Sequence, residues 1–139
     1  MNSVAESRAT SGLPRITVGQ VLLAIAAVHS LVGMLGGLGL HPNIRFGGAP
    51  PLTAMWREGV VASVGADPWR VSVTWFLLWG VAFGLVGLLA HQVERTGLLL
   101  SRSFGAALGA LCLVGVLLMP ESGFWLGIVP VALIFRRAR

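Results

Sequence analysis

Four long segments of this chain are almost free of charged side chains, which limits its fold more than any other feature. They cover residues 16–40, 70–91, 98–119 and 122–136. Only 11% of the residues are charged, 55% are hydrophobic, and the mean hydropathy is +0.84. A soluble domain carries about 25% charged residues, and a disordered chain combines low hydrophobicity with high charge. The sequence therefore predicts an all-α integral membrane protein.

The lengths of these segments predict a four-helix membrane bundle. A helix rises 1.5 Å per residue, so the 25 residues of 16–40 reach about 37 Å and exceed a hydrocarbon core of about 30 Å. Asp67 and Pro68 suit the N-cap and the first turn of the second helix. The last segment is the shortest, and it spans only if Arg136 and Arg137 extend their side chains to the lipid headgroups or the bilayer becomes thinner around it.

The rest of the chain divides into a tail and one long loop. Residues 1–15 are polar and predict a disordered cytoplasmic tail, so residues 16–139 form a single membrane domain. Within the loop, residues 52–64 place their larger apolar side chains on one face of a helix. We expect a short helix lying in the membrane interface, with Trp56 as its anchor. The alternative is a loop helix that only caps the bundle.

The basic residues predict the orientation of the protein. All ten are arginine, and with the N-terminus inside, seven lie on the cytoplasmic side and three on the outer side. This split follows the positive-inside rule and predicts a multi-pass protein of the cell membrane with both termini cytoplasmic. Because most of the arginines flank apolar segments, nucleic acid is not expected as a partner.

Glycine pairs predict how the helices pack. Each apolar segment holds one GxxxG pair, a spacing that lets helix backbones approach closely in lipid. Tight packing within one bundle explains these pairs, and a homodimer through one of these faces is the alternative. The pairs are Gly33/Gly37, Gly80/Gly84, Gly105/Gly109 and Gly123/Gly127.

His29 is the polar residue predicted to lie deepest in the membrane. An ionisable residue at this depth indicates a functional site unless it is a neutral imidazole bonded to a neighbouring helix. His29 and Glu58 are the candidate catalytic residues. Trp75, Trp79 and Trp56 are the candidate walls of a ligand pocket, although the first two could instead fill space beside glycines.

Several kinds of site are not expected. His91 lies about 15 Å from His29 along the membrane normal, so the two cannot share a haem within one subunit. The single cysteine, Cys112, excludes an internal disulfide and a CxxC motif. The sequence contains no Walker loop, GxGxxG or HExxH motif. No metal and no cofactor are predicted.

Three stretches carry a resemblance to a family. They are AAVHSLVG, TWFLLWGVAFGLVGLL and MPESGFWLGIVPVAL, and together they resemble an uncharacterised family of small actinobacterial membrane proteins with four predicted helices. The resemblance covers about residues 17–135. It implies the four-helix architecture and no chemistry, because the family carries no assigned activity. His29 lies at the position of the family's histidine.

Three functions remain open at this stage. The first is a small membrane protein that binds a lipophilic ligand or serves as an accessory subunit, with membrane lipid and a lipophilic small molecule as partners. The second is an intramembrane enzyme of the isomerase or cyclase type, acting on an isoprenoid or sterol-like substrate through proton transfer by His29 and Glu58. The third is a small dimeric exporter, disfavoured because no span holds a carboxylate. The enzymatic function requires a cavity that reaches His29.

Overall fold

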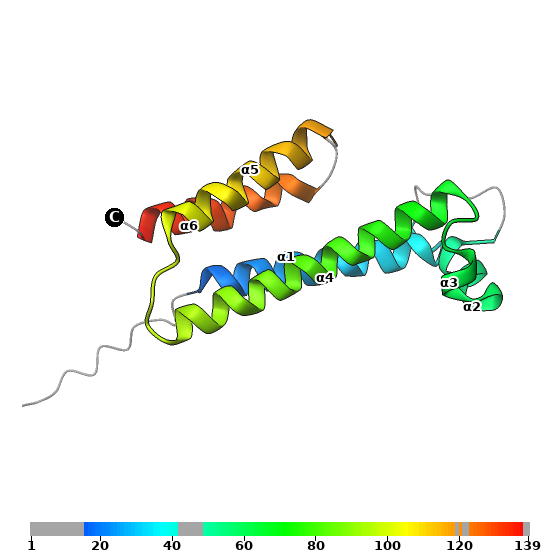
Figure 1. Cartoon of the computed structure of the whole chain (residues 1–139), viewed down its shortest axis with the longest axis horizontal. Helices are drawn as coiled ribbons and strands as arrows, with labels where there is room; N and C mark the ends of the chain where they lie inside the picture. The colour runs from blue at the N-terminus through cyan, green and yellow to red at the C-terminus, as the bar shows by residue number, and fades with distance from the viewer. Residues whose placement is uncertain (1–15, 42–48, 119, 121–122, 138–139) are drawn as a thin grey trace, which may run out of the picture.

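The structure is a computed structural model that describes residues 16–41, 49–118, 120 and 123–137. Within these residues it is all α-helical and contains no β-strand, as predicted. The long helices form two antiparallel hairpins (Figure 1). In chain order the elements are α1 (Val18–Gly37), α2 (Pro51–Glu58), α3 (Val60–Ser63), α4 (Pro68–Arg95), α5 (Arg102–Leu118), the 3₁₀-helix η1 (Gly123–Gly127) and α6 (Ile128–Arg137).

Helices α1 and α4 pack backbone against backbone. A Cβ atom added at Gly19 would overlap the backbone of His91, and one added at Gly87 would lie 2.9 Å from the backbone nitrogen of Leu23. Gly84, from the predicted GxxxG pair, is different, because its Cβ would meet the surrounding side chains at an ordinary distance of 3.8 Å. The backbone-to-backbone contacts therefore depend on Gly19 and Gly87, which belong to no predicted pair, whereas Gly33 and Gly80 of the predicted pairs lie close to side chains of the facing helix.

Capping residues fix where these two helices begin. Thr17 accepts a hydrogen bond from the amide of Gln20, whose side chain accepts one from the amide of Thr17, forming a capping box. Asp67 accepts from the amides of Trp69 and Arg70 at the start of α4, which confirms the predicted N-cap. With 28 residues, α4 extends beyond the predicted 70–91 at both ends.

The second hairpin pairs α5 with η1 and α6. Gly105 faces Ile134, and Gly115 leaves room for the ring of Phe124. The predicted helix 122–136 is divided, since η1 precedes α6. Pro130 occupies the first turn of α6, where its missing N–H breaks no intrahelical hydrogen bond.

The predicted interfacial helix 52–64 is also divided. α2 ends at Glu58 and α3 begins at Val60, because Gly59 between them has a φ of +91° that glycine adopts without strain. Within this region Ser63 is buried, whereas Val61 is 93% exposed.

The two hairpins share a buried core at one end. Their shared core holds Val18 and Leu22 of α1, Ala90 of α4, Leu108 and Cys112 of α5, and Ile134 of α6. We call the end of the first hairpin at Val18 and Arg95 the closed end. From there α1 and α4 continue past the second hairpin to α2 and α3 (Figure 1), and we call this other end the open end.

Two helices, α1 and α4, are long and apolar enough to cross a membrane, and α5 is a shorter apolar helix. Their length and composition agree with the first two predicted spans. The predicted tail, residues 1–15, and residues 42–48 of the long loop lie outside the described residues.

Candidate functional site

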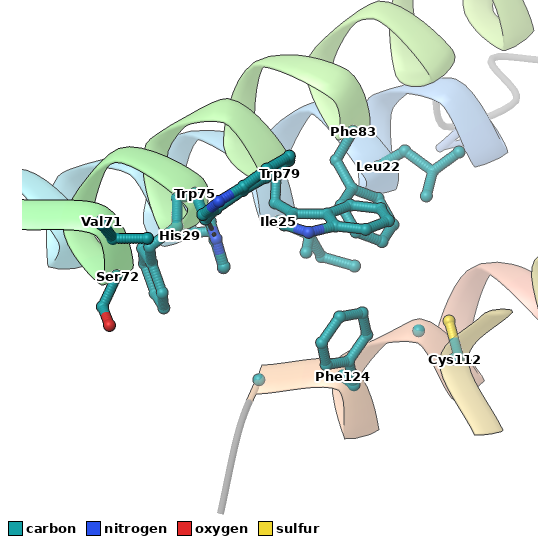
Figure 2. Close-up of a pocket in the computed structure, with 13 residues that line it drawn as sticks. Leu22, Ile25, His29, Val71, Ser72, Trp75, Trp79, Phe83, Cys112 and Phe124 are labelled. Atoms are coloured by element: carbon teal, nitrogen blue, oxygen red, sulfur yellow. Dashed lines mark hydrogen bonds between the residues drawn. The ribbon is translucent and has the colours of Figure 1, made fainter. Parts of the chain in front are cut away.

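A cavity of about 370 Å³ lies between the two hairpins, on the open-end side of their shared core. Figure 2 shows side chains of the first hairpin facing Phe124 and Cys112 of the second. Its volume falls within the usual range for small-molecule sites. The side chains around it are almost all apolar, and the lining residues are Leu22, Ile25, His29, Val71, Ser72, Trp75, Phe76, Trp79, Phe83, Cys112, Gly123, Phe124 and Gly127.

Three aromatic rings form the part of the cavity wall that bridges the hairpins. Trp79 lies 6.1 Å from Phe83 on the same helix and 6.3 Å from Phe124 of η1, measured between ring centroids. The Phe124 ring meets the other two at angles of 79° and 60°. Edge-to-face pairs of this kind are favourable. The rings therefore connect the hairpins while leaving space beside them.

His29 combines a structural contact with exposure to the cavity. Its Nε2 donates to the backbone carbonyl oxygen of Phe76 at 3.0 Å, and its ring stacks on that of Phe76 at a centroid distance of 3.8 Å. This is the carbonyl of a neighbouring helix that the structural interpretation of His29 required. Gly80 makes the contact feasible, because a Cβ there would lie 3.3 Å from the imidazole and overlap Ser30. The same imidazole lines the cavity, so the contact leaves a functional role open.

The structure brings together three of the five predicted site residues. His29, Trp75 and Trp79 all line the cavity. Trp56 does not, since its side chain is 85% exposed and borders a separate groove among α1, α2, α3 and α4. Glu58 is not among the lining residues either, because its carboxylate is bound elsewhere.

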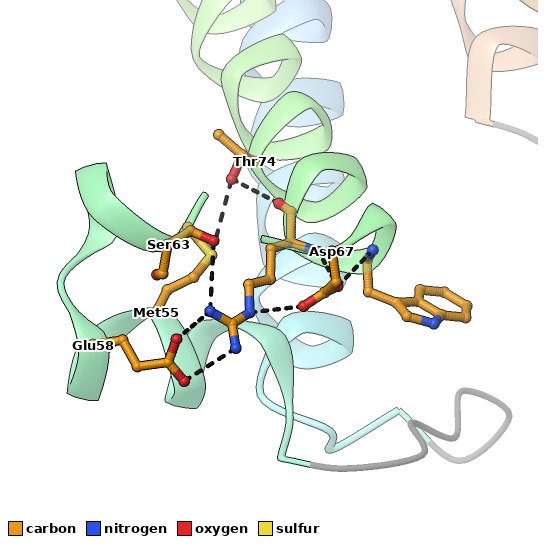
Figure 3. A network of polar contacts seen from close by, with 7 residues as sticks. Met55, Glu58, Ser63, Asp67 and Thr74 are labelled. Carbon is orange, nitrogen blue, oxygen red and sulfur yellow. Dashed lines mark hydrogen bonds and ion pairs between the residues drawn. The ribbon is translucent and has the colours of Figure 1, made fainter. Parts of the chain in front are cut away.

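Glu58 belongs to an ion-pair network at the open end (Figure 3). Arg70 binds both carboxylate oxygens of Glu58, and its Nε lies 2.8 Å from Oδ2 of Asp67. Its Nη1 also approaches the carbonyl oxygen of Ser63 at 3.5 Å. The hydrogen bonds from Arg70 lower the pKa of Glu58 below its ordinary value. The network therefore attaches α2 and α3 to the first turn of α4.

A second polar cluster, at the closed end, was missed by the sequence analysis. The carboxylate of Glu94 accepts hydrogen bonds from the amides of Val18 and Gly19, at 3.0 and 2.8 Å, and from Nη1 of Arg137 at 3.0 Å. Arg137 also donates to the carbonyl oxygen of Ile16. A carboxylate at a helix N-terminus is favourable because the free amides carry partial positive charge. Glu94 thus joins α4 to α1 and to α6.

The histidines of the described residues are not arranged to hold a metal. His91 faces Thr17, with Nδ1 3.1 Å from the hydroxyl oxygen. His29 is bonded to Phe76, as described above. Within the part of the chain that the structure describes, no group of three or more histidine, cysteine or acidic side chains could hold a metal ion.

Residues 14–139 match the family of unknown function DUF6463. The chain belongs to this family. The match includes both hairpins, the cavity and the two polar clusters, so the whole described architecture lies within the family domain. No curated protein and no solved structure matches the chain. The family carries no activity that could be transferred to the cavity.

Proposed function

We propose that this member of DUF6463 is a small multi-pass membrane protein whose cavity binds a lipophilic ligand. The observation that carries the proposal is the cavity itself, which is apolar, lies between two hairpins and contains His29 among aromatic rings. Apolar cavities with a few fixed polar groups are the usual form of small-molecule sites. In a bilayer, such a site opening between helices is accessible to molecules dissolved in the lipid.

The outer surfaces of the helices support the membrane part of the proposal. Large apolar side chains point outward along α4 and α5, and Leu89 and Leu117 are 63% and 73% exposed. Exposing so much apolar surface to water is costly, at about 25 cal/mol per Å², whereas lipid solvates it. The charged clusters of Glu94 and Arg70 lie at opposite ends of the first hairpin. This distribution suits four helices in a bilayer.

Helix lengths support two crossings in each hairpin. α1 with 20 residues is about 30 Å long, and α5 with 17 residues is about 25 Å long. η1 and α6 together return over a similar distance at about 2.0 and 1.5 Å per residue. The second hairpin is the shorter one, so it crosses with its terminal arginines reaching to the headgroups.

The orientation proposed from the arginines places the closed end in the cytoplasm. Single cysteines at Val61, which is 93% exposed, and at Leu99, which is 64% exposed, test it in a Cys112→Ser background. An impermeant thiol reagent added to intact cells should label the first and spare the second. The reverse pattern would show the opposite orientation.

Ligand binding is tested by filling the cavity. Ile25 lines it, whereas Leu31 on the same helix is 58% exposed and does not. We expect native mass spectrometry of the purified protein to detect a co-purified lipophilic molecule. Ile25→Trp should reduce its occupancy at least several-fold, and the matched variant Leu31→Trp should not. A cavity that is empty in the wild type, or equal occupancy in both variants, contradicts the proposal.

In the enzymatic alternative, Glu58 was expected to act together with His29, and the structure does not bring these two residues together. Proton transfer to an isoprenoid or sterol-like substrate was expected to use His29 with Glu58. Glu58 is bound to Arg70 at the open end, and no described carboxylate lines the cavity. The geometry therefore favours binding over catalysis.

A further inference from the structure

The polar groups of the cavity limit what its ligand can carry. None of the described residues that line the cavity carries a carboxylate, an ammonium or a guanidinium group. A charged ligand head would therefore be buried without a counter-charge, which is costly. Trp75 and Trp79 offer indole N–H groups that can only donate, while His29 offers an imidazole. If the cavity binds a lipophilic ligand as proposed above, that ligand is electrically neutral.

The tautomer of His29 adds a second restriction. The carbonyl oxygen of Phe76 can only accept a hydrogen bond, so the ring nitrogen bonded to it, Nε2, carries the proton. In the neutral imidazole the lone pair then lies on Nδ1. Among the described residues, no hydrogen bond reaches Nδ1. Because His29 lines an apolar cavity, a ligand that carries a hydrogen-bond donor would satisfy this acceptor.

We infer that the ligand is a neutral lipid alcohol whose hydroxyl donates to Nδ1 of His29. A hydroxyl is both donor and acceptor, so its oxygen can also accept from an indole N–H of Trp75 or Trp79. A quinone or an ester offers only acceptors and would leave Nδ1 unpaired. The hydrocarbon part lies along the rings of Phe83 and Phe124. At about 370 Å³ the cavity suits one compact chain or a small ring system.

The test compares two probes, of which one has a hydrogen-bond donor and the other does not. Farnesol and farnesyl methyl ether share the same isoprenoid chain, and the ether keeps the oxygen but loses the O–H. With an equimolar mixture, native mass spectrometry should show the wild type retaining the alcohol about three- to tenfold more than the ether, the range expected for one hydrogen bond.

Variants assign the preference to His29. His29→Leu should retain both probes equally, and His29→Gln should keep a preference, because its amide can donate to the Phe76 carbonyl while its oxygen accepts. Thr74→Ala is the control, since Thr74 lies on α4 outside the cavity and bonds to the carbonyl oxygen of Arg70. It should leave the preference unchanged.

A spectroscopic readout is independent of whether His29→Leu folds. In protein with ¹⁵N-labelled histidine, farnesol should shift the Nδ1 resonance of His29, and the ether should not. Equal retention of both probes by the wild type, or a preference that survives in His29→Leu, overturns the inference and leaves the lipophilic-cavity proposal intact. If the wild type retains neither probe and no other lipophile, both proposals fail.

Discussion

Both ends of the first hairpin contain an arginine–glutamate ion pair, but the two pairs differ in burial and in the helices that they join. Each contains an arginine bound to a glutamate, Arg137 with Glu94 at the closed end and Arg70 with Glu58 at the open end. The Glu94 side chain is 9% exposed and joins both hairpins, whereas that of Glu58 is 52% exposed and holds only the small helices α2 and α3. Location therefore decides whether an ion pair holds the fold together or attaches a peripheral element.

The two ends also differ in how closely the backbones of α1 and α4 pack. At the closed end, Gly19 and Gly87 bring α1 and α4 into backbone contact, and the second hairpin covers them. Beyond Leu22 the two hairpins enclose a cavity, which is lined by aromatic side chains of both. The hairpins are therefore packed tightly at the closed end and leave an apolar space on the open-end side of it.

The largest effect is expected from breaking the closed-end packing. In Gly87→Ala the new Cβ would lie 2.9 Å from a backbone nitrogen, and a backbone cannot rotate away as a side chain can. We expect a loss of about 2–3 kcal/mol in stability, typical of overpacking. Gly84→Ala, three residues earlier with its Cβ at 3.8 Å, should be neutral or slightly stabilising.

Thermal unfolding of the two glycine variants in detergent provides the measurement. Equal melting temperatures would contradict the assignment of the close contact to Gly87.

A smaller loss is expected from Glu94→Gln. The amide keeps one acceptor oxygen for the amides of Val18 and Gly19 but loses the charge that faces Arg137. Because Arg137 is partly exposed, we expect the folded state to lose about 1–2 kcal/mol of stability, which is less than the loss for a fully buried ion pair. Denaturation in detergent should show this loss together with weaker docking of α6. A stability equal to that of the wild type would show that the closed end is held by apolar contacts alone.

The smallest effect is expected at the open end. The pKa of Glu58 is lowered in the folded protein, so its contribution is present above the unfolded-state pKa and is lost as pH falls through the folded value. Acidification, or Glu58→Gln at neutral pH, should lower the hydrogen-exchange protection factors of residues 51–63, which are corrected for the intrinsic effect of pH on exchange. Protection in α1 should not change. Loss of protection throughout α1 and α4 would contradict a peripheral role for this network.

The sequence predicts the long helices well because their signals are local. Apolar length placed α1 and α4, and Asp67 marked the start of α4. The break at Gly59 was missed, since an apolar face at helical spacing continued across it and only the backbone angle interrupts it. A glycine within a predicted surface helix is the signal that could have indicated the break.

The candidate site was predicted in part for the same reason. His29, Trp75 and Trp79 stood out as unusual side chains within apolar segments, and all three line the cavity. The role of Glu94 depends on amides 76 and 75 residues away, at Val18 and Gly19. No local pattern encodes such a distant contact. The cavity itself arises from how two hairpins diverge, which composition and periodicity do not specify.

The position of Cys112 gives the protein a built-in chemical reporter. It is the single cysteine of the chain, it is buried, and its side chain lies in the cavity wall next to Gly127. A small apolar thiol reagent can reach this sulfur through the cavity, or through the groove among α5, η1 and α6 that Cys112 also lines. A slower alkylation of the unmodified protein in the presence of a candidate ligand would therefore report that the ligand occupies the cavity.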